Sequence, residues 1–174
     1  EFNLKAGEML ILAEKLLESF LKLHNFDSFK IIRNINKNEI EDLTCFHPLH
    51  SIGYDEKIKI YPSRHVTDES GTGFVHIAPN HGLEDFDVGK KFGLDNNETV
   101  NEHGLYSKNI PFFSGKHIFK VDEEVIQKLN QDKNLISKNK YNHSYPHSWR
   151  SKAPLIFRAT SQWFISMETD QLRK

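Results

Sequence analysis

The chain has 174 residues, of which 37% are apolar, and this supports one domain with its own hydrophobic core rather than two. Its formal net charge is -1, whereas free-standing nucleic-acid-binding domains usually carry an excess of lysine and arginine. The single cysteine, Cys45, excludes an internal disulfide and a cysteine-based zinc site. No stretch is apolar enough to cross a membrane and no secretory signal is recognisable, so the sequence predicts a cytoplasmic protein.

Charge is unevenly distributed along the chain. Residues 116–158 contain nine Lys or Arg against four Asp or Glu, whereas residues 1–115 contain twelve against eighteen. A solvated, lysine-rich surface is the simpler explanation of the local excess. Contact with the phosphates of a nucleic acid is the other explanation.

The first predicted element is a hairpin, with a turn at Ala6-Gly7 between residues 2–5 and 9–12. An amphipathic helix follows over residues 13–23, with Leu16, Leu17, Phe20 and Leu21 on its buried side. Asn, Asp, Gly and Pro then separate short predicted strands, a spacing typical of barrels and other β-rich domains. These strands cover residues 28–35, 40–46 and 57–61.

Two further helices are predicted in the second half. The helix over residues 86–93 ends at Gly93, which suits a C-cap. The helix over residues 121–129 has acidic residues in its first turn, where the helix dipole favours negative charge. Extended segments follow from Leu135 onward. The elements together predict an α+β, β-rich fold with a distorted β-barrel core and peripheral helices.

The densest group of functional residue types is GTGFVHIAPNHGLEDFD, residues 71–87, called the GTG motif below. Gly71 and Gly73 give the backbone around Thr72 unusual freedom. Residues 74–78 read as a short buried strand with one polar residue, His76, and a loop then leads into a helix. Such a loop commonly presents polar groups to a ligand.

Three kinds of site are compatible with the GTG motif. A metal site would use His76, His81, Asp85 and Asp87, although their spacing differs from that of a His-Glu-x-x-His helix. Nucleophilic catalysis would need Thr72 beside His76 on one face of a regular strand. A binding pocket would need only Asp85 and His76 to fix a substrate while water attacks. A core histidine, a first-turn acid and a tight turn are the purely structural explanations.

The GTG motif resembles the editing domain inserted in the class I aminoacyl-tRNA synthetases for isoleucine, valine and leucine, and the isoleucine enzyme is the nearest. The shared features are a Gly-Thr-Gly-x-Val start, a Pro-x-His turn and an Asp followed by an aromatic residue, here at 71–75, 79–81 and 85–86. A second block, HSYPHSWRSKAPLIFRATSQWFISM at 143–167, resembles the return from this insertion to the synthetic domain. The resemblance implies one editing domain over residues 1–174, with return strands over about 143–174.

The implied activity is post-transfer editing, the hydrolysis of valine from mischarged tRNA(Ile). A hydrophobic pocket discriminates one methylene by only about 1–3 kcal/mol, a value for which the isoleucine and valine pair is the reference case. The implied partner is the 3' acceptor end of tRNA(Ile), and a monomer is expected. Editing of this kind needs no metal or cofactor, whereas the synthetic reaction of a full-length synthetase uses ATP. Ser148 and Ser151 stand where some relatives carry cysteines, which argues against a metal there.

The resemblance also assigns roles to single residues. Asp85 is implied to bind the α-ammonium group of the substrate and, with Thr72, to form the catalytic part of the site. His76 is implied to reject isoleucine by size. The remaining implied contacts are substrate binding by Gly71, Gly73 and Val75, and tRNA binding by Arg150 and Lys152.

One departure from the family leaves a second function open. The threonine-rich segment that forms the opposite wall of the family's pocket normally lies upstream, and the sequence has no counterpart of it. The chain is therefore expected to be a fragment of a synthetase. The alternative function is a module that binds the tRNA 3' end without hydrolysing the ester.

Overall fold

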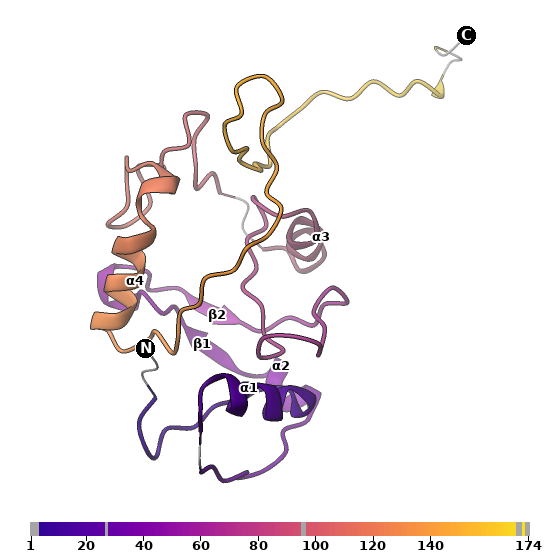
Figure 1. The fold of residues 1–174 in the computed structure, drawn as a ribbon. Helices are drawn as coiled ribbons and strands as arrows, with labels where there is room; N and C mark the ends of the chain where they lie inside the picture. The colour runs from indigo at the N-terminus through magenta and orange to yellow at the C-terminus, as the bar shows by residue number, and fades with distance from the viewer. Residues whose placement is uncertain (1–3, 27, 95–96, 170–171, 173–174) are drawn as a thin grey trace.

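The computed structural model describes residues 4–26, 28–94, 97–169 and 172 (Figure 1). Helices and loops dominate, and one small sheet lies among them. In chain order the elements are η1 (Glu14–Leu16), α1 (Leu17–Leu23), α2 (Lys37–Glu41), β1 (Thr44–Phe46), η2 (His50–Ile52), β2 (Lys57–Lys59), α3 (Leu83–Phe92), η3 (Ile118–Lys120) and α4 (Asp122–Gln131).

The sheet within the described residues consists of β1 and β2, which pair antiparallel with Cys45 opposite Ile58. Isolated bridges join Val100 to Tyr106, Leu105 to His117 and His147 to Pro154. The α+β class is therefore confirmed, whereas the barrel stays a prediction. Strand prediction was correct at residues 57–59 and 44–46 and wrong at 28–35 and 74–78, where the backbone has no ladder partner.

Helix α2 occupies part of a segment that was predicted as strand. Its N-terminus is a capping box: the Asn36 side chain accepts from the Glu39 amide, and the Glu39 carboxylate accepts from the Asn36 amide, both at 3.0 Å. This reciprocal pair satisfies two amides that would otherwise lack partners. Ile40 therefore lies in a helix, because the Asn-x-x-Glu signature determines the local structure more strongly than the apolar residue.

The other three helices were predicted correctly. Leu16 and Phe20 are the buried residues of η1 and α1, as the amphipathic pattern indicated. Helix α3 ends at Gly93, whose φ of 65° lies in the left-handed region that glycine favours. Helix α4 carries three acidic residues in its first turn. The turn at Ala6-Gly7 also forms, closed by a hydrogen bond from the Glu8 amide to the Lys5 carbonyl. The hairpin predicted around this turn is wrong, because residues 4–5 and 9–12 form no strands, and residues 2–3 lie outside the described residues.

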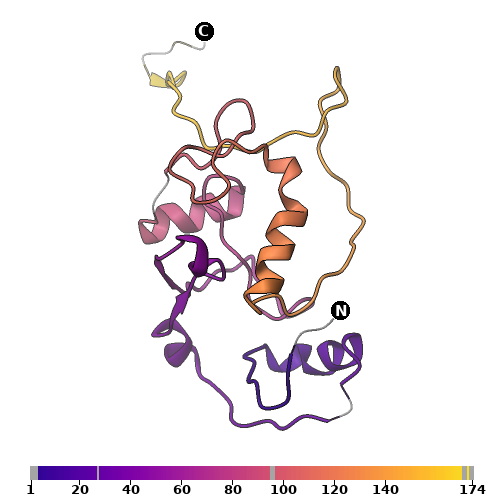
Figure 2. The same cartoon turned by 90° about the vertical axis from the view of Figure 1, so that its left-hand side faces the viewer.

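A hydrophobic core cluster of Leu49, Phe113 and Val121 lies beside α4, and Leu16, Phe20, Val88 and Val100 are buried outside this cluster. Partly buried residues pack around it: Ile52, Tyr54, Tyr106, Ile110, Val125 and Leu129. Figure 2 shows the chain after α4 running along the outside of the molecule to a loop and then to the C-terminal end. This core anchors one side of the molecule, and the GTG motif lies outside it.

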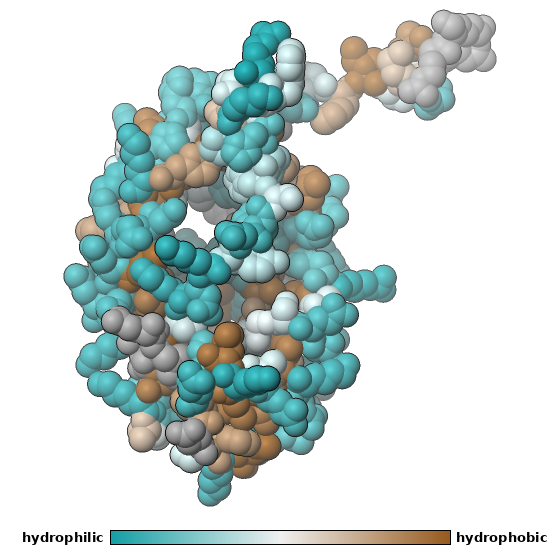
Figure 3. Space-filling model, in the orientation of Figure 1, coloured by the Kyte–Doolittle hydropathy of each residue, from teal (hydrophilic) through white to brown (hydrophobic). Residues whose placement is uncertain are grey.

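The molecular surface is largely hydrophilic in the view of Figure 3, but hydrophobic residues gather near α1 and along the C-terminal segment. Trp163, Phe164 and Ile165 in that segment are strongly exposed. In the part of the chain that the structure describes, no helix has the length and apolar character needed to span a bilayer.

Candidate functional site

The glycine turn that opens the GTG motif packs against the start of η1. Gly71 and Gly73 have φ values of 74° and 85°, which side chains with a Cβ rarely adopt. The Thr72 carbonyl accepts a hydrogen bond from the Ala13 amide at 2.8 Å. A Cβ on Gly73 would lie only 2.8 Å from the Ala13 Cβ. Glycine is therefore needed at residue 73 both for its backbone conformation and for this close approach.

The Thr72 side chain takes part in the turn itself. Its Oγ1 accepts from the Phe74 amide at 3.3 Å and lies 3.4 Å from the Phe74 carbonyl. These described hydrogen bonds use local backbone and no imidazole. The arrangement therefore gives no support to a Thr72 and His76 nucleophile pair, and a catalytic role for Thr72 stays a prediction.

Val75 and His76 both face solvent. The sequence indicated a buried strand here, but residues 74–78 form an open segment instead. Burial lowers the pKa of His47, and the nearby charge of His76 lowers it further. His76 thus lies close to His47, whose ring stacks on Tyr54 with centroids 4.6 Å apart. No sequence signal pointed to His47, which is distant from the motif along the chain.

Asp85 occupies the first turn of α3 and turns back toward the preceding loop. Its Oδ2 accepts a hydrogen bond from the Ala78 amide at 3.0 Å. A Cβ on Gly82 would lie 2.8 Å from the same oxygen, so the absence of a side chain there makes room for the carboxylate. Its Oδ1 lies 3.7 Å from the His65 Nε2. Asp85 therefore fixes the loop that precedes α3 through Oδ2, while its other oxygen, Oδ1, does not bond to the Ala78 amide.

The second histidine of the motif, His81, holds two distant parts of the chain together. Its Nδ1 lies 2.8 Å from the Phe157 carbonyl oxygen, and its Nε2 lies 2.6 Å from the Thr99 Oγ1. The Ala159 amide also donates to the Asn80 carbonyl at 2.8 Å. The two blocks that carry the sequence resemblance are thus in direct contact. His81 is a structural residue of this junction.

Arg158 strengthens the same junction. Its Nε donates to the Val100 carbonyl at 2.8 Å, and its guanidinium pairs with the Glu98 carboxylate. Because Arg158 is adjacent in sequence to Phe157, one short segment contacts the loop after α3 and the GTG motif together. The sequence could not have revealed this contact.

Arg150 and Lys152 lie in a separate loop. The Ser148 amide donates to the Ala153 carbonyl, and the Lys152 amide donates to the Ser148 carbonyl, both at 2.9 Å. The Arg150 guanidinium lies 5.2 Å from the exposed Trp149 ring. Both basic residues are exposed, and the loop projects near the top of Figure 1, beyond α3. Both side chains are available to an anionic partner, but the hydrogen bonds described for this loop do not involve the GTG motif.

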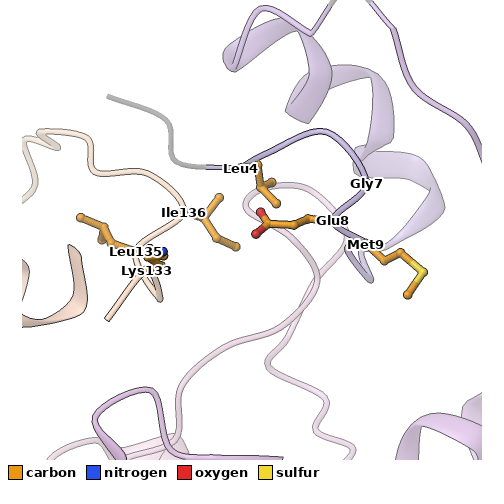
Figure 4. A pocket seen from close by; sticks show the side chains of 7 residues that line it. All are labelled: Leu4, Gly7, Glu8, Met9, Lys133, Leu135 and Ile136. Atoms are coloured by element: carbon orange, nitrogen blue, oxygen red, sulfur yellow. The ribbon is translucent and has the colours of Figure 1, made fainter. Parts of the chain in front are cut away.

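A pocket of about 330 Å³ lies in another part of the molecule (Figure 4). The N-terminal turn and the segment after α4 form its walls, and its lining residues are Leu4, Gly7, Glu8, Met9, Lys133, Leu135 and Ile136. None of these residues was predicted to bind a ligand. Of the predicted site residues, Gly71, Val75, His76, Arg150 and Lys152 are exposed, whereas Thr72, Gly73 and Asp85 are partly buried.

A metal centre at the motif finds no geometric support. Both ring nitrogens of His81 are within hydrogen-bonding distance of Phe157 and Thr99. Over the described ranges of the chain, no group of three or more His, Cys, Asp or Glu side chains is placed to hold an ion. The Asp85 carboxylate, in contrast, retains acceptor capacity beyond the hydrogen bond from Ala78.

Comparison of the sequence with known proteins identifies the class to which the chain belongs. The chain is homologous to a segment of the aminoacyl-tRNA synthetases. The relatives are isoleucine–tRNA ligases: that of Pelagibacter ubique is 50% identical over 168 residues, covering 97% of this chain and 19% of the relative. Those of Teredinibacter turnerae and Francisella philomiragia are 43% and 44% identical, each covering 95% of this chain and 17% of the relative.

The resemblance to a segment of isoleucine–tRNA ligase is therefore confirmed. The chain spans less than a fifth of the length of these relatives. A comparison with models of protein families finds no match.

We predict that Gly82→Ala dislodges the Asp85 carboxylate. The substitution should destabilise the chain by about 1–3 kcal/mol in urea unfolding, the usual cost of overpacking. In an Asp85→Ala background the two closest contacts, with Oδ2 at 2.8 Å and Cγ at 3.1 Å, are absent and only the 3.3 Å contact with the Cβ remains. A double-mutant cycle should therefore give a coupling on the order of 1 kcal/mol. Costs that add to within about 0.5 kcal/mol would show that Gly82 does not constrain the carboxylate.

Proposed function

We propose that this chain is the post-transfer editing segment of a cytoplasmic isoleucyl-tRNA synthetase, which hydrolyses valine from mischarged tRNA(Ile). One observation carries the proposal: the Asp85 carboxylate is held at the start of α3 by the Ala78 amide, three residues after the N-cap Gly82. An aminoacyl ester differs from most esters in carrying a free ammonium group. A positioned carboxylate is the group that recognises it.

The chemistry proposed for the site divides into recognition and hydrolysis. Asp85 pairs with the α-ammonium and thereby places the ester. Water then attacks the carbonyl carbon, the bond to the ribose oxygen breaks, and valine and uncharged tRNA leave. Thr72 and the flanking glycines are proposed to contact the terminal adenosine or orient the water through their backbone groups. This reaction consumes no cofactor, and ATP serves only the synthetic reaction of the full-length enzyme.

Selection against isoleucine is assigned to His76 together with Val75. Both residues are exposed in the chain and therefore available to form a wall against the substrate's side chain. The opposite wall is proposed to come from a threonine-rich segment of the full-length synthetase, and the complete domain is proposed to have the barrel core of the family. Arg150 and Lys152, on their projecting loop, are proposed to contact phosphates near the acceptor end. The synthetase is proposed to act as a monomer.

The charge of Asp85 is expected to be essential for editing. In the full-length synthetase, Asp85→Ala and Asp85→Asn should each lower kcat/KM for deacylation of Val-tRNA(Ile) by roughly 10-fold to 100-fold, the cost of a lost charged hydrogen bond. The asparagine variant is the sharper test, because its amide oxygen can still accept from the Ala78 amide.

Asp87→Asn is the matched control, since Asp87 is an exposed acid two residues further along α3. Its deacylation rate should match that of the unsubstituted enzyme. Unchanged deacylation in Asp85→Asn would remove Asp85 from the site. If the full-length protein binds the tRNA but leaves the ester intact, the non-hydrolytic binding module is the correct function.

His76 is expected to set the size limit. His76→Ala in the full-length enzyme should raise the rate of Ile-tRNA(Ile) deacylation by about tenfold or more, because one methylene changes binding by about 1–3 kcal/mol. His103→Ala, at an exposed histidine outside the motif, is the control. Continued rejection of Ile-tRNA(Ile) by His76→Ala would show that another wall excludes isoleucine.

A further inference from the structure

His65 lies outside the GTG motif, yet its ring is packed against Asp85. The two side chains are only 24% and 20% exposed, and His65 Nε2 lies 3.7 Å from Asp85 Oδ1. On the other side of the ring, Nδ1 lies 2.7 Å from the Ser63 Oγ. His65 Nε2 is fully buried and has no hydrogen-bond partner in the structure. A buried polar nitrogen without a partner costs folding free energy, so its presence at this position calls for an explanation.

The contact with Ser63 determines which ring nitrogen can donate toward Asp85. When the Ser63 hydroxyl donates to Nδ1, the proton of a neutral imidazole is on Nε2. The Nε2–H group then faces the Asp85 carboxylate. If the distance between His65 Nε2 and Asp85 Oδ1 shortens by a few tenths of an ångström to about 1 Å, the two atoms form a hydrogen bond.

The acceptor capacity of Asp85 allows this contact and substrate binding together. An ionised carboxylate has about four lone-pair positions. The Ala78 amide uses one on Oδ2, and His65 would use one on Oδ1, which leaves one on each oxygen. A neutral imidazole adds no charge, so the carboxylate keeps its attraction for an ammonium group.

We propose that His65 is a positioning residue: through Nε2–H it fixes the Asp85 carboxylate in the orientation that receives the substrate's α-ammonium group. Two donors from different parts of the chain, Ala78 on one oxygen and His65 on the other, restrain rotation of the carboxylate about its terminal bond. Ser63 acts behind His65 by holding the ring tautomer. This inference rests on the proposed function, because it assigns Asp85 the task of binding the amine.

Two substitutions of His65 test the roles of its two ring nitrogens separately. His65→Gln places an amide nitrogen near the former Nε2 and keeps a donor toward Asp85. His65→Asn keeps a polar group near the former Nδ1, facing Ser63, and removes the donor. In the full-length synthetase, His65→Asn should raise KM for Val-tRNA(Ile) deacylation about tenfold with kcat within about twofold, because it weakens substrate binding. His65→Gln should restore KM to within about threefold of the original value.

Two controls keep the result interpretable. Aminoacylation with isoleucine reports whether each variant is folded, and His103→Asn reports the effect of an unrelated exposed histidine. Equal KM values for His65→Asn and the unsubstituted enzyme, or equal defects in His65→Asn and His65→Gln, would overturn the inference. The proposed function fails separately, if the unsubstituted full-length protein leaves the ester of Val-tRNA(Ile) intact, and the role of Asp85 fails if Asp85→Asn retains full deacylation activity.

Discussion

The hydrogen bond from the Ala78 amide to Asp85 Oδ2 is the contact on which the geometry of the GTG motif depends. It ties the end of the open segment to the first turn of α3 across seven residues. A charged acceptor makes such a bond stronger than a neutral one. Gly82 lies directly beneath the same oxygen and makes room for it. The residue proposed to bind the substrate thus also folds the loop around it.

A second set of contacts joins the motif to the return segment. His81 and Asn80 bond to Phe157 and Ala159, and Arg158 bonds to the loop that follows α3. These bonds lie outside the core of Leu49, Phe113 and Val121. The motif is therefore fixed mainly by polar contacts rather than by a surrounding apolar core. A surface organised in this way leaves Val75 and His76 open to a partner.

Local signals in the sequence predicted local structure well. Glycine at residue 93 and acids at the start of α4 marked helix ends, because caps and dipoles act over one turn. Strand prediction failed at residues 28–35 and 74–78, because a strand needs a partner that may lie anywhere in the chain. In α2, the capping box overrode the apolar pattern.

The distinction between local signals and contacts made by distant segments also applies to the candidate site. Asp85, His76 and the glycine turn could be selected from the sequence because the motif concentrates them. His65 and Phe157 could not, because their contacts depend on how distant segments meet. No spacing rule joins residue 81 to residue 157. The sequence therefore indicated candidate site residues, whereas the contacts that orient them required the fold.

The most direct test of the central claim is a binding cycle on the amine itself. Two non-hydrolysable ligands would be titrated by calorimetry into the full-length synthetase: adenosine carrying valine through a 3'-amide, and the same compound without the amino group. We predict that the unsubstituted protein prefers the amine ligand by about tenfold or more, and that Asp85→Asn binds both equally. An undiminished amine preference in Asp85→Asn would contradict the account.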